Sequence, residues 1–164
     1  MLVWVMADSH DRLQMIERAV EKANAQNAEL LLHAGDFISP FTASKFKNFK
    51  AKKIGVFGNN DGDKNLLLKK YSEIGFEIRG KFAEINVDNL RIALLHGDET
   101  ELLNSLINCG GYDIVIHGHT HEAKVYKVNK TLVLNPGETC GYLTGKATAA
   151  LLNTKTMRVE IIEL

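Results

Sequence analysis

The chain has 164 residues, of which 45% are hydrophobic, and its twenty basic residues are balanced by twenty acidic ones. This length and apolar content suit a single domain, which we expect to span residues 1–164. Because the net charge is zero, the chain offers no general attraction to a nucleic-acid backbone or an anionic membrane, and we expect neither as a partner.

Three short apolar runs near the N-terminus predict strands, and each is followed by a polar turn. The runs are Leu2–Met6, Leu30–His33 and Lys53–Phe57. Apolar residues at helical spacing follow the first and third runs, whereas the segment after the second begins with serine and proline. The repeated order of strand, turn and helix is typical of α/β proteins.

The helices expected in this region have recognisable starts. Asp11 is a candidate N-cap for the first helix. Ser39-Pro40 is typical of a helix start and predicts a second helix that extends to Phe49. Lys64–Glu73 predicts a third.

After the third helix the pattern changes to paired strands. Phe82–Val87 and Leu90–Leu95 flank Asp88-Asn89, which suits a tight hairpin turn. A helix over Glu99–Asn108 precedes a buried strand, Ile114–Ile116, and two further strand pairs follow. Together these elements predict two facing sheets with helices outside.

Residues able to bind metals gather at the carboxyl ends of the predicted strands, the edge at which open α/β sheets bind ligands. Four of the six histidines lie in this set, and glycines beside them allow close backbone approach. In chain order the motifs are Asp8-x-His10, Gly35-Asp36, Gly58-Asn59-x-Asp61, His96-Gly97 and Gly118-His119-x-His121.

These five motifs, in this order, resemble the signature of the calcineurin-like metallophosphoesterases, and in particular of their small bacterial and archaeal phosphodiesterase branch. Asn135-Pro136-Gly137-Glu138 resembles a further element of that branch. The resemblance implies an α/β fold in the form of a four-layer α/β/β/α sandwich of two facing mixed sheets, the metallophosphoesterase fold.

The resemblance also implies a site for two divalent metal ions and hydrolysis by a hydroxide that bridges them. Asp36, Asn59 and His96 would be its catalytic residues. Mixed nitrogen and oxygen ligands suit Mn²⁺ or Ni²⁺, which we favour, and Fe²⁺, Co²⁺ or Zn²⁺, better than Mg²⁺ or Ca²⁺. Asp36 would bridge the ions, and the other implied metal ligands are Asp8, His10 and His121 for one ion and Asn59, His96 and His119 for the other.

Two candidate substrate-binding residues, Asn60 and Asp98, depart from the family pattern. Asn60 stands where many relatives have a histidine that assists the leaving group, and an amide cannot act as an acid. We therefore expect faster turnover of esters with acidic leaving groups. Asp98 either contacts His96 or a substrate, or caps the helix that begins near Glu99, and we favour the cap.

Other candidates have structural interpretations. His33 and His117 do not follow the motif pattern, so we expect them in the core or behind the ligands. Asn135-Pro136-Gly137 is either a turn that ends a strand or part of the site, and both readings stay open. Cys140 is expected to be a buried apolar side chain.

We interpret the chain as a cytoplasmic metal-dependent phosphodiesterase that hydrolyses small diesters or nucleotide-like substrates. Two cysteines are too few for a disulfide framework, which fits a reducing compartment. The alternatives are a phosphomonoesterase or nuclease of the same fold, or a non-catalytic protein-binding scaffold such as the retromer subunit that shares it. The complete ligand set argues against the scaffold. A homodimer or homotetramer is expected, as is common in the family.

Overall fold

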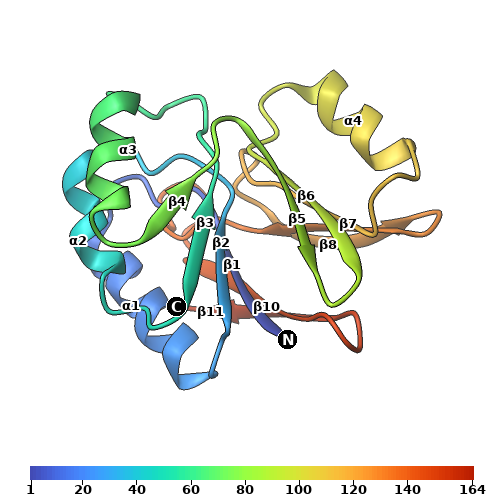
Figure 1. Ribbon diagram of the computed structural model, residues 1–164, viewed down its shortest axis with the longest axis horizontal. Coiled ribbons are helices and arrows are strands. Elements are labelled where there is room, and N and C mark those ends of the chain that lie inside the picture. Colours follow the sequence, from blue (N-terminus) through green and yellow to red (C-terminus); the bar gives the residue numbers. More distant parts are fainter.

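The computed structural model describes residues 1–164, and its strands form two sheets that face each other (Figure 1). The first sheet has six strands in the order β11-β10-β1-β2-β3-β4, and the second has five in the order β5-β6-β7-β9-β8. The strands in chain order are β1 (Leu2–Met6), β2 (Leu30–His33), β3 (Lys52–Gly55), β4 (Phe76–Ile78), β5 (Phe82–Val87), β6 (Leu90–Leu95), β7 (Ile114–Ile116), β8 (Ala123–Val128), β9 (Thr131–Pro136), β10 (Thr148–Asn153) and β11 (Arg158–Glu163).

The strands that precede the predicted ligands run parallel within each sheet. In the first sheet β1, β2, β3 and β4 are parallel, and β10 and β11 add an antiparallel pair beside β1. In the second sheet β6, β7 and β9 are parallel, with β5 and β8 antiparallel to their neighbours. Because parallel strands end at the same edge, the loops after them meet there.

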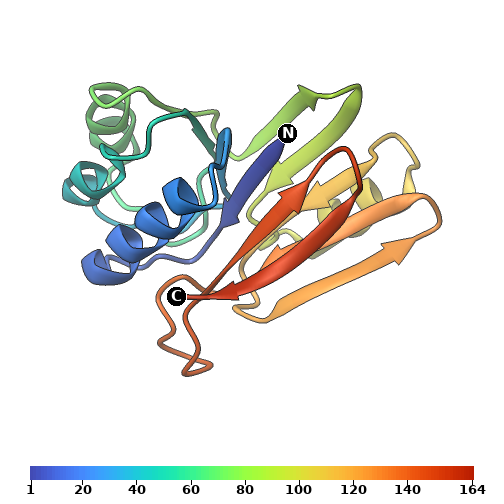
Figure 2. The same cartoon turned by 90° about the horizontal axis from the view of Figure 1, so that it is seen from below.

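Helices cover the outer face of each sheet (Figure 2). The helices α1 (Leu13–Ala25), α2 (Ala43–Phe46) and α3 (Lys64–Ser72) lie on the first sheet, and α4 (Thr100–Asn108) lies on the second. None of them is long and apolar enough to span a bilayer. The layer order is helices, sheet, sheet, helix, which confirms the predicted four-layer sandwich.

The side chains of β1 show how the layers are held together. Val3 and Val5 point into the core between the sheets, where they join residues of the second sheet such as Ile92. Trp4 and Met6 point the other way and pack under the helices. Alternate residues of a strand face opposite sides, so a strand buried on both faces is apolar throughout, as this one is.

Several element boundaries differ from the sequence-based expectation. Asp11 does not cap α1, because its carboxylate instead accepts hydrogen bonds from the backbone N–H and the hydroxyl of Ser39. The segment after Ser39 forms a 3₁₀ turn, Pro40–Thr42, and a helix that ends at Phe46 rather than Phe49. Hydroxyls of this segment bond to carbonyls three residues back, which competes with a regular helical ladder.

Candidate metal centre

The loops after β1, β2, β3, β6 and β7 carry the seven predicted metal ligands. Left-handed backbone conformations cost about 1–2 kcal/mol for residues with a side chain, and they cluster at functional sites. The fold therefore holds these side chains in place against the local preference of the backbone. Five of the seven ligands have φ between 38° and 69°, namely Asp8, His10, Asp36, His119 and His121.

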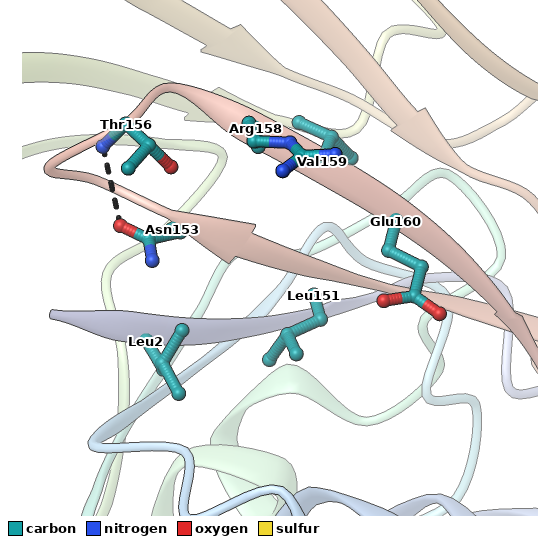
Figure 3. Close-up of a pocket in the computed structure, with 7 residues that line it drawn as sticks. All are labelled: Leu2, Leu151, Asn153, Thr156, Arg158, Val159 and Glu160. Atoms are coloured by element: carbon teal, nitrogen blue, oxygen red, sulfur yellow. Dashed lines mark hydrogen bonds between the residues drawn. The ribbon is translucent and has the colours of Figure 1, made fainter.

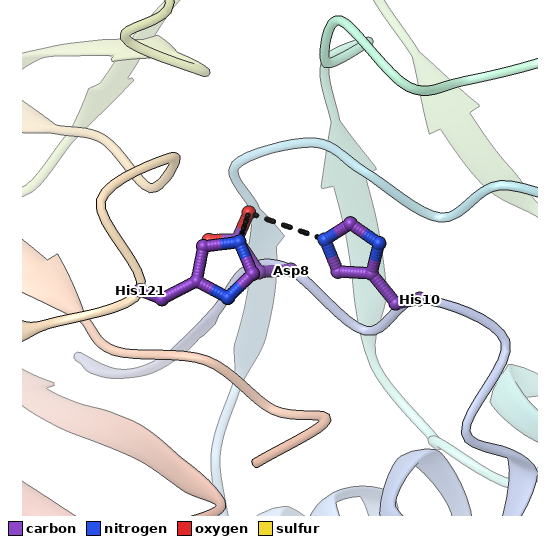
Figure 4. A group of neighbouring side chains, drawn as sticks. All are labelled: Asp8, His10 and His121. Atoms are coloured by element: carbon purple, nitrogen blue, oxygen red, sulfur yellow. Dashed lines mark ion pairs between the residues drawn. The ribbon is translucent and has the colours of Figure 1, made fainter. Parts of the chain in front are cut away.

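Asp8, His10 and His121 form a first cluster (Figure 4). Asp8 Oδ1 lies 3.8 Å from His10 Nε2 and 3.6 Å from His121 Nε2. Asp8 is fully buried, and its other oxygen accepts a hydrogen bond of 3.0 Å from the backbone N–H of His119. The backbone thus holds one carboxylate oxygen, while the other faces both imidazoles.

Asp36 lies between His10 and His96. Its Oδ2 is 3.4 Å from His10 Nε2 and 3.4 Å from His96 Nε2. Asn60 orients this carboxylate, because its backbone N–H donates to Oδ1 at 2.9 Å and its side-chain amide donates to Oδ2 at 2.8 Å. One oxygen of Asp36 is therefore shared between the imidazoles of two different loops.

Asn59 and His119 complete the set at its exposed rim. His119 Nδ1 lies 3.1 Å from Asn59 Oδ1, and the His119 ring is 5.1 Å from the His96 ring between centroids. Asn59 and His119 are exposed, whereas Asp8, Asp36 and His96 are buried. The structure therefore brings all seven predicted residues into one group that runs from a buried floor to an open rim.

The donor atoms of this group fit divalent metal ions. Asp8 Oδ1, His10 Nε2 and His96 Nε2 are buried and have no hydrogen-bond partner, a condition that costs about 1–3 kcal/mol per atom. They face one another: Asp8 Oδ1 is 3.8 Å from His10 Nε2 and 4.0 Å from His96 Nε2. Ligands about 2.0–2.2 Å from one transition metal lie about 3–4 Å apart, which matches the separations of Asp8 Oδ1 from Nε2 of His10 and of His121, the set implied for one ion.

Hydrogen bonds behind two imidazoles decide which ring nitrogen faces the group. His96 Nδ1 lies 2.8 Å from the carbonyl oxygen of Ala34, which can only accept, so Nδ1 carries a proton. His121 Nδ1 lies 2.7 Å from the carboxylate of Glu138 in the same way. In both neutral rings the lone pair is then on Nε2, the atom that faces the carboxylates.

The imidazole of His96 and the carboxylate of Asp36 stabilise each other's charged forms. Burial lowers the pKa of His96, but the nearby carboxylates of Asp36 and Asp8 and the Ala34 carbonyl outweigh it and raise that pKa to about 9. Burial raises the pKa of Asp36, but His96 and the donors of Asn60 hold it well below its usual range.

Asp98 does not cap α4, contrary to the interpretation favoured from the sequence. The N-cap position is Glu99, one residue further on, and no side chain accepts a hydrogen bond at this helix start. Asp98 is half-buried and lines a small cavity of about 110 Å³ together with His96, Lys81 and Phe82. The alternative reading, contact with His96 or a substrate, stays a prediction.

A larger depression of about 480 Å³ lies away from this group, against β1, β10 and β11 (Figure 3). It is lined by Leu2 at the start of β1, whereas Asp8 follows the end of that strand. Its charged residues are Arg158 and Glu160, and none of the clusters of metal-binding side chains lies in it. The chemistry of the donor set, and not the size of the depression, identifies the candidate site.

The two remaining histidines are buried behind the ligands, as expected. His33 stacks on Phe37 and places Nε2 3.1 Å from the hydroxyl of Ser9, which lies between Asp8 and His10 in the chain. His117 is also buried, and its Nδ1 lies 3.1 Å from the carbonyl oxygen of the next residue. Neither side chain belongs to a cluster of potential metal ligands.

The Asn-Pro-Gly element ends β9 with a turn at Gly137 and also lies beside the group, so the two open readings do not exclude each other. The side-chain amide of Asn135 donates to the carbonyl oxygen of Gly118 at 2.9 Å and to the hydroxyl of Thr120 at 3.0 Å. These residues flank His119. Asn135 therefore braces the loop that carries two of the predicted ligands.

Glu138, which follows this element, is a residue whose role the sequence did not reveal. It is fully buried and contacts His121, as described above, and the thiol of Cys140 donates to it at 3.1 Å. Burial raises the pKa of Cys140 to about 12, so the thiol stays a donor. Cys140 is buried as expected but is also hydrogen-bonded. The sequence signal that could have revealed the role of Glu138 is its position, as an acidic residue directly after the Asn-Pro-Gly element.

Comparison with known proteins agrees with this geometry. The family model described as the calcineurin-like phosphoesterase superfamily domain matches residues 1–157. A phosphodiesterase of Methanocaldococcus jannaschii is 41% identical over 156 residues, which are 94% of each chain.

Solved structures of phosphoesterases have the same fold as this chain. An archaeal phosphodiesterase superposes with a TM-score of 0.95 at 39% identity and with full coverage of both chains. The E. coli phosphoesterase Yfce has a TM-score of 0.75 over 99% of this chain and 98% of its own, and its 18% identity supports the fold alone. The resemblance inferred from the motifs is confirmed, and the chain belongs to the calcineurin-like phosphoesterase superfamily.

Proposed function

We propose that the protein is a phosphodiesterase that hydrolyses its substrate at a centre of two divalent metal ions. The observation that carries the proposal is the position of Asp36 Oδ2, 3.4 Å from the unpaired Nε2 atoms of both His10 and His96. A carboxylate oxygen shared in this way suits two ions about 3.5–4 Å apart. The relative with 41% identity is named a phosphodiesterase, which supports the diester as the substrate class.

The seven residues divide into two sets around Asp36. Asp8, His10 and His121 would hold one ion, and Asn59, His96 and His119 would hold the other. When bound, the ions supply Lewis acidity, which activates water near neutral pH and neutralises negative charge on a phosphoryl group.

The chain itself contributes position and access. The two hydrogen bonds from Asn60 fix the Asp36 carboxylate, and the backbone N–H of His119 fixes Asp8. Asn59 and His119 lie at an exposed rim, so an ester reaches the site without a lid having to open. We propose small diesters or nucleotide-like compounds as substrates because such an open rim accepts varied leaving groups.

Four imidazoles with carboxylate and amide oxygens favour Mn²⁺ or Ni²⁺, with Fe²⁺, Co²⁺ or Zn²⁺ as further candidates. We also propose a cytoplasmic location and a homo-oligomeric assembly, in line with the expectations from the sequence. Size-exclusion chromatography with light scattering tests the assembly directly, and a monomer would contradict it.

The test of the substrate class uses metal-stripped protein to which Mn²⁺, Ni²⁺, Co²⁺, Zn²⁺ or Mg²⁺ is added back. Bis-p-nitrophenyl phosphate represents the diesters and p-nitrophenyl phosphate the monoesters. We expect faster hydrolysis of the diester, restored by transition metals more than by Mg²⁺. Faster hydrolysis of the monoester would make the protein a phosphomonoesterase, and metal binding without hydrolysis of either would favour the non-catalytic scaffold.

A variant of the shared carboxylate tests the site. Asp36→Asn removes the negative charge between the two sets of ligands, and we expect a loss of at least about 100-fold in kcat/KM. Asp63→Asn is the matched control. Asp63 caps α3 through its side chain, and asparagine caps helices about as well, so this variant should keep full activity.

A further inference from the structure

We propose that Glu138 is the positioning residue for His121, holding its proton on Nδ1 so that Nε2 is free to bind a metal. The proposal rests on the proposed function only in taking His121 as a metal ligand. Glu138 Oε2 lies 2.7 Å from His121 Nδ1, and His121 Nε2 lies 3.6 Å from Asp8 Oδ1. The imidazole thus stands between a buried carboxylate and the metal group, an arrangement known to fix the tautomer of metal-binding histidines.

Glu138 is buried without an arginine or lysine partner, and hydrogen bonds alone compensate its charge. Its Oε1 accepts from the backbone N–H groups of Leu143 and Thr144, at 2.9 Å and 2.6 Å, and from the Thr144 hydroxyl at 2.8 Å. Its Oε2 accepts from His121, from the Cys140 thiol at 3.1 Å and from Leu143 N–H at 3.2 Å. Every polar group that contacts this carboxylate therefore donates a hydrogen bond to it.

The two sides of the carboxylate differ in whether their donors can change role. Backbone N–H groups only donate, so the side that faces Leu143 and Thr144 requires an oxygen. On the other side, the imidazole of His121 can move its proton to the other nitrogen, and the thiol of Cys140 can rotate. The Leu143 N–H also lies 3.2 Å from Oε2, but its shorter bond of 2.9 Å to Oε1 remains when a donor replaces Oε2. The His121 side is the only one at which a donor in place of Oε2 could be tolerated.

This asymmetry gives the variant Glu138→Gln a defined consequence. The amide oxygen of the glutamine has to take the Oε1 side, which puts its NH₂ group against His121 Nδ1. Nδ1 then has to accept, and the proton moves to Nε2. An Nε2–H group directed at Asp8 Oδ1 cannot bind a metal. The substitution therefore keeps the size of the side chain and inverts the tautomer of His121.

Glu138 also connects His121 to an exposed loop. Tyr142 and Leu143, at 59% and 75% exposure, lie in the segment between β9 and β10 that projects from the body of the molecule (Figure 2). The backbone of this segment bonds to the same carboxylate that contacts His121. A variant that removes the carboxylate altogether would disturb the loop as well, which is why glutamine is the informative replacement.

The first test reads the tautomer in the metal-free protein. Long-range ¹H–¹⁵N correlation spectra at alkaline pH report which imidazole nitrogen carries the proton, and a His121→Gln variant assigns the signal. We expect Nδ1–H in the wild type and Nε2–H in Glu138→Gln. An Nε2–H tautomer of His121 in the wild type would overturn the proposal, even if the variant failed to fold.

The second test measures metal binding by calorimetry with Mn²⁺. Glu138→Gln should weaken one of two binding events by about 10–100-fold and leave the other unchanged, because only the set with Asp8 and His10 includes His121. Cys140→Ala is the matched control, since it removes a donor to the same oxygen without touching His121. Equal metal affinities in Glu138→Gln and the wild type would contradict the proposal. The predicted tautomer together with absent diester hydrolysis would refute the proposed function alone.

Discussion

The position of the Asp36 carboxylate depends on the absence of a side chain at residue 58. A Cβ atom on Gly58 would collide with Asp36 Oδ1 and would lie 2.6 Å from the Asp36 backbone nitrogen. We predict that Gly58→Ala displaces this carboxylate and weakens Mn²⁺ binding at least about 10-fold, with a loss of about 1–3 kcal/mol in the free energy of unfolding.

Gly62→Ala is the matched control in the same loop, because a Cβ there meets only the carbonyl oxygen of Ile38 at 3.5 Å. Calorimetry measures the Mn²⁺ affinity of both alanine variants, and urea denaturation measures their free energy of unfolding. Wild-type metal affinity in Gly58→Ala would show that the carboxylate position is not constrained in this way.

The amide side chain of Asn60 should determine how the rate of hydrolysis depends on the pKa of the leaving group. Its side-chain amide donates to Asp36 and has no titratable proton to give to a departing oxygen. We expect the rate of aryl diester hydrolysis to fall steeply as the pKa of the leaving group rises, and Asn60→His to reduce this slope. Asn60→Ala separates loss of the Asp36 contact from gain of an acid. A flat dependence in the wild type would count against this account.

Motif residues could be placed from the sequence because each lies directly after a predictable strand. Asp8, Asp36 and His96 follow the apolar runs of β1, β2 and β6, and the parallel arrangement brings them together. The pairing of His121 with Glu138 could not be predicted in this way, since the two are 17 residues apart and meet only through the return of the chain along β9. The cap expected at Asp98 was wrong by one residue, which is the usual precision of helix starts.

At the level of elements, Asp61 holds the loops after β2 and β3 together. Its Oδ2 accepts from the N–H of Gly58 at 2.7 Å and of Asp36 at 3.2 Å, and its Oδ1 accepts from the N–H of Ile38 at 2.8 Å. Ile38 has φ of 82°, an unfavourable value for a β-branched residue, so this loop needs such support.

We therefore predict that Asp61→Ala lowers the free energy of unfolding by at least about 3 kcal/mol, because three backbone N–H groups lose their acceptor. Urea denaturation measures the change. Asp61→Asn keeps one acceptor oxygen and should lose less. A loss below about 1 kcal/mol in Asp61→Ala would mean that water replaces the carboxylate.

Elements with a clear apolar pattern were easier to predict than elements without one. Helix α3, the hairpin of β5 and β6, and strand β7 lie where the pattern placed them, and Asp88 and Asn89 in the hairpin turn both have positive φ, as a two-residue turn of this kind requires. Strand β4 was not predicted, because its three residues include the charged Glu77, whereas the equally short β7 is apolar throughout. The early end of α2 follows from hydroxyl-to-backbone hydrogen bonds, which the spacing of apolar residues does not reveal.

For the whole molecule, the predicted metal ligands come from both sheets. Asp8, His10, Asp36 and Asn59 follow strands of the first sheet, whereas the ligands after residue 95 follow strands of the second. A metal bound by both sets would therefore link the two halves of the sandwich and stabilise the folded state alone. At 100 times the dissociation constant the gain is about 2.7 kcal/mol, which corresponds to a melting temperature about 5–10 °C higher.

Thermal denaturation of metal-stripped protein with and without Mn²⁺ measures this gain. Asp36→Asn should lose most of it, whereas the cap variant Asp63→Asn should keep it. An identical melting temperature with and without metal would indicate that the clustered donors do not bind the ion in the folded state.

Titration of metal-stripped protein with Mn²⁺, with hydrolysis of bis-p-nitrophenyl phosphate followed at each addition, tests whether the protein is a two-metal hydrolase. At protein concentrations well above the dissociation constants, we predict that the rate rises until two equivalents are bound per chain and then stays constant. Saturation at one equivalent would contradict the dinuclear site. Binding of two equivalents without hydrolysis would contradict the phosphodiesterase.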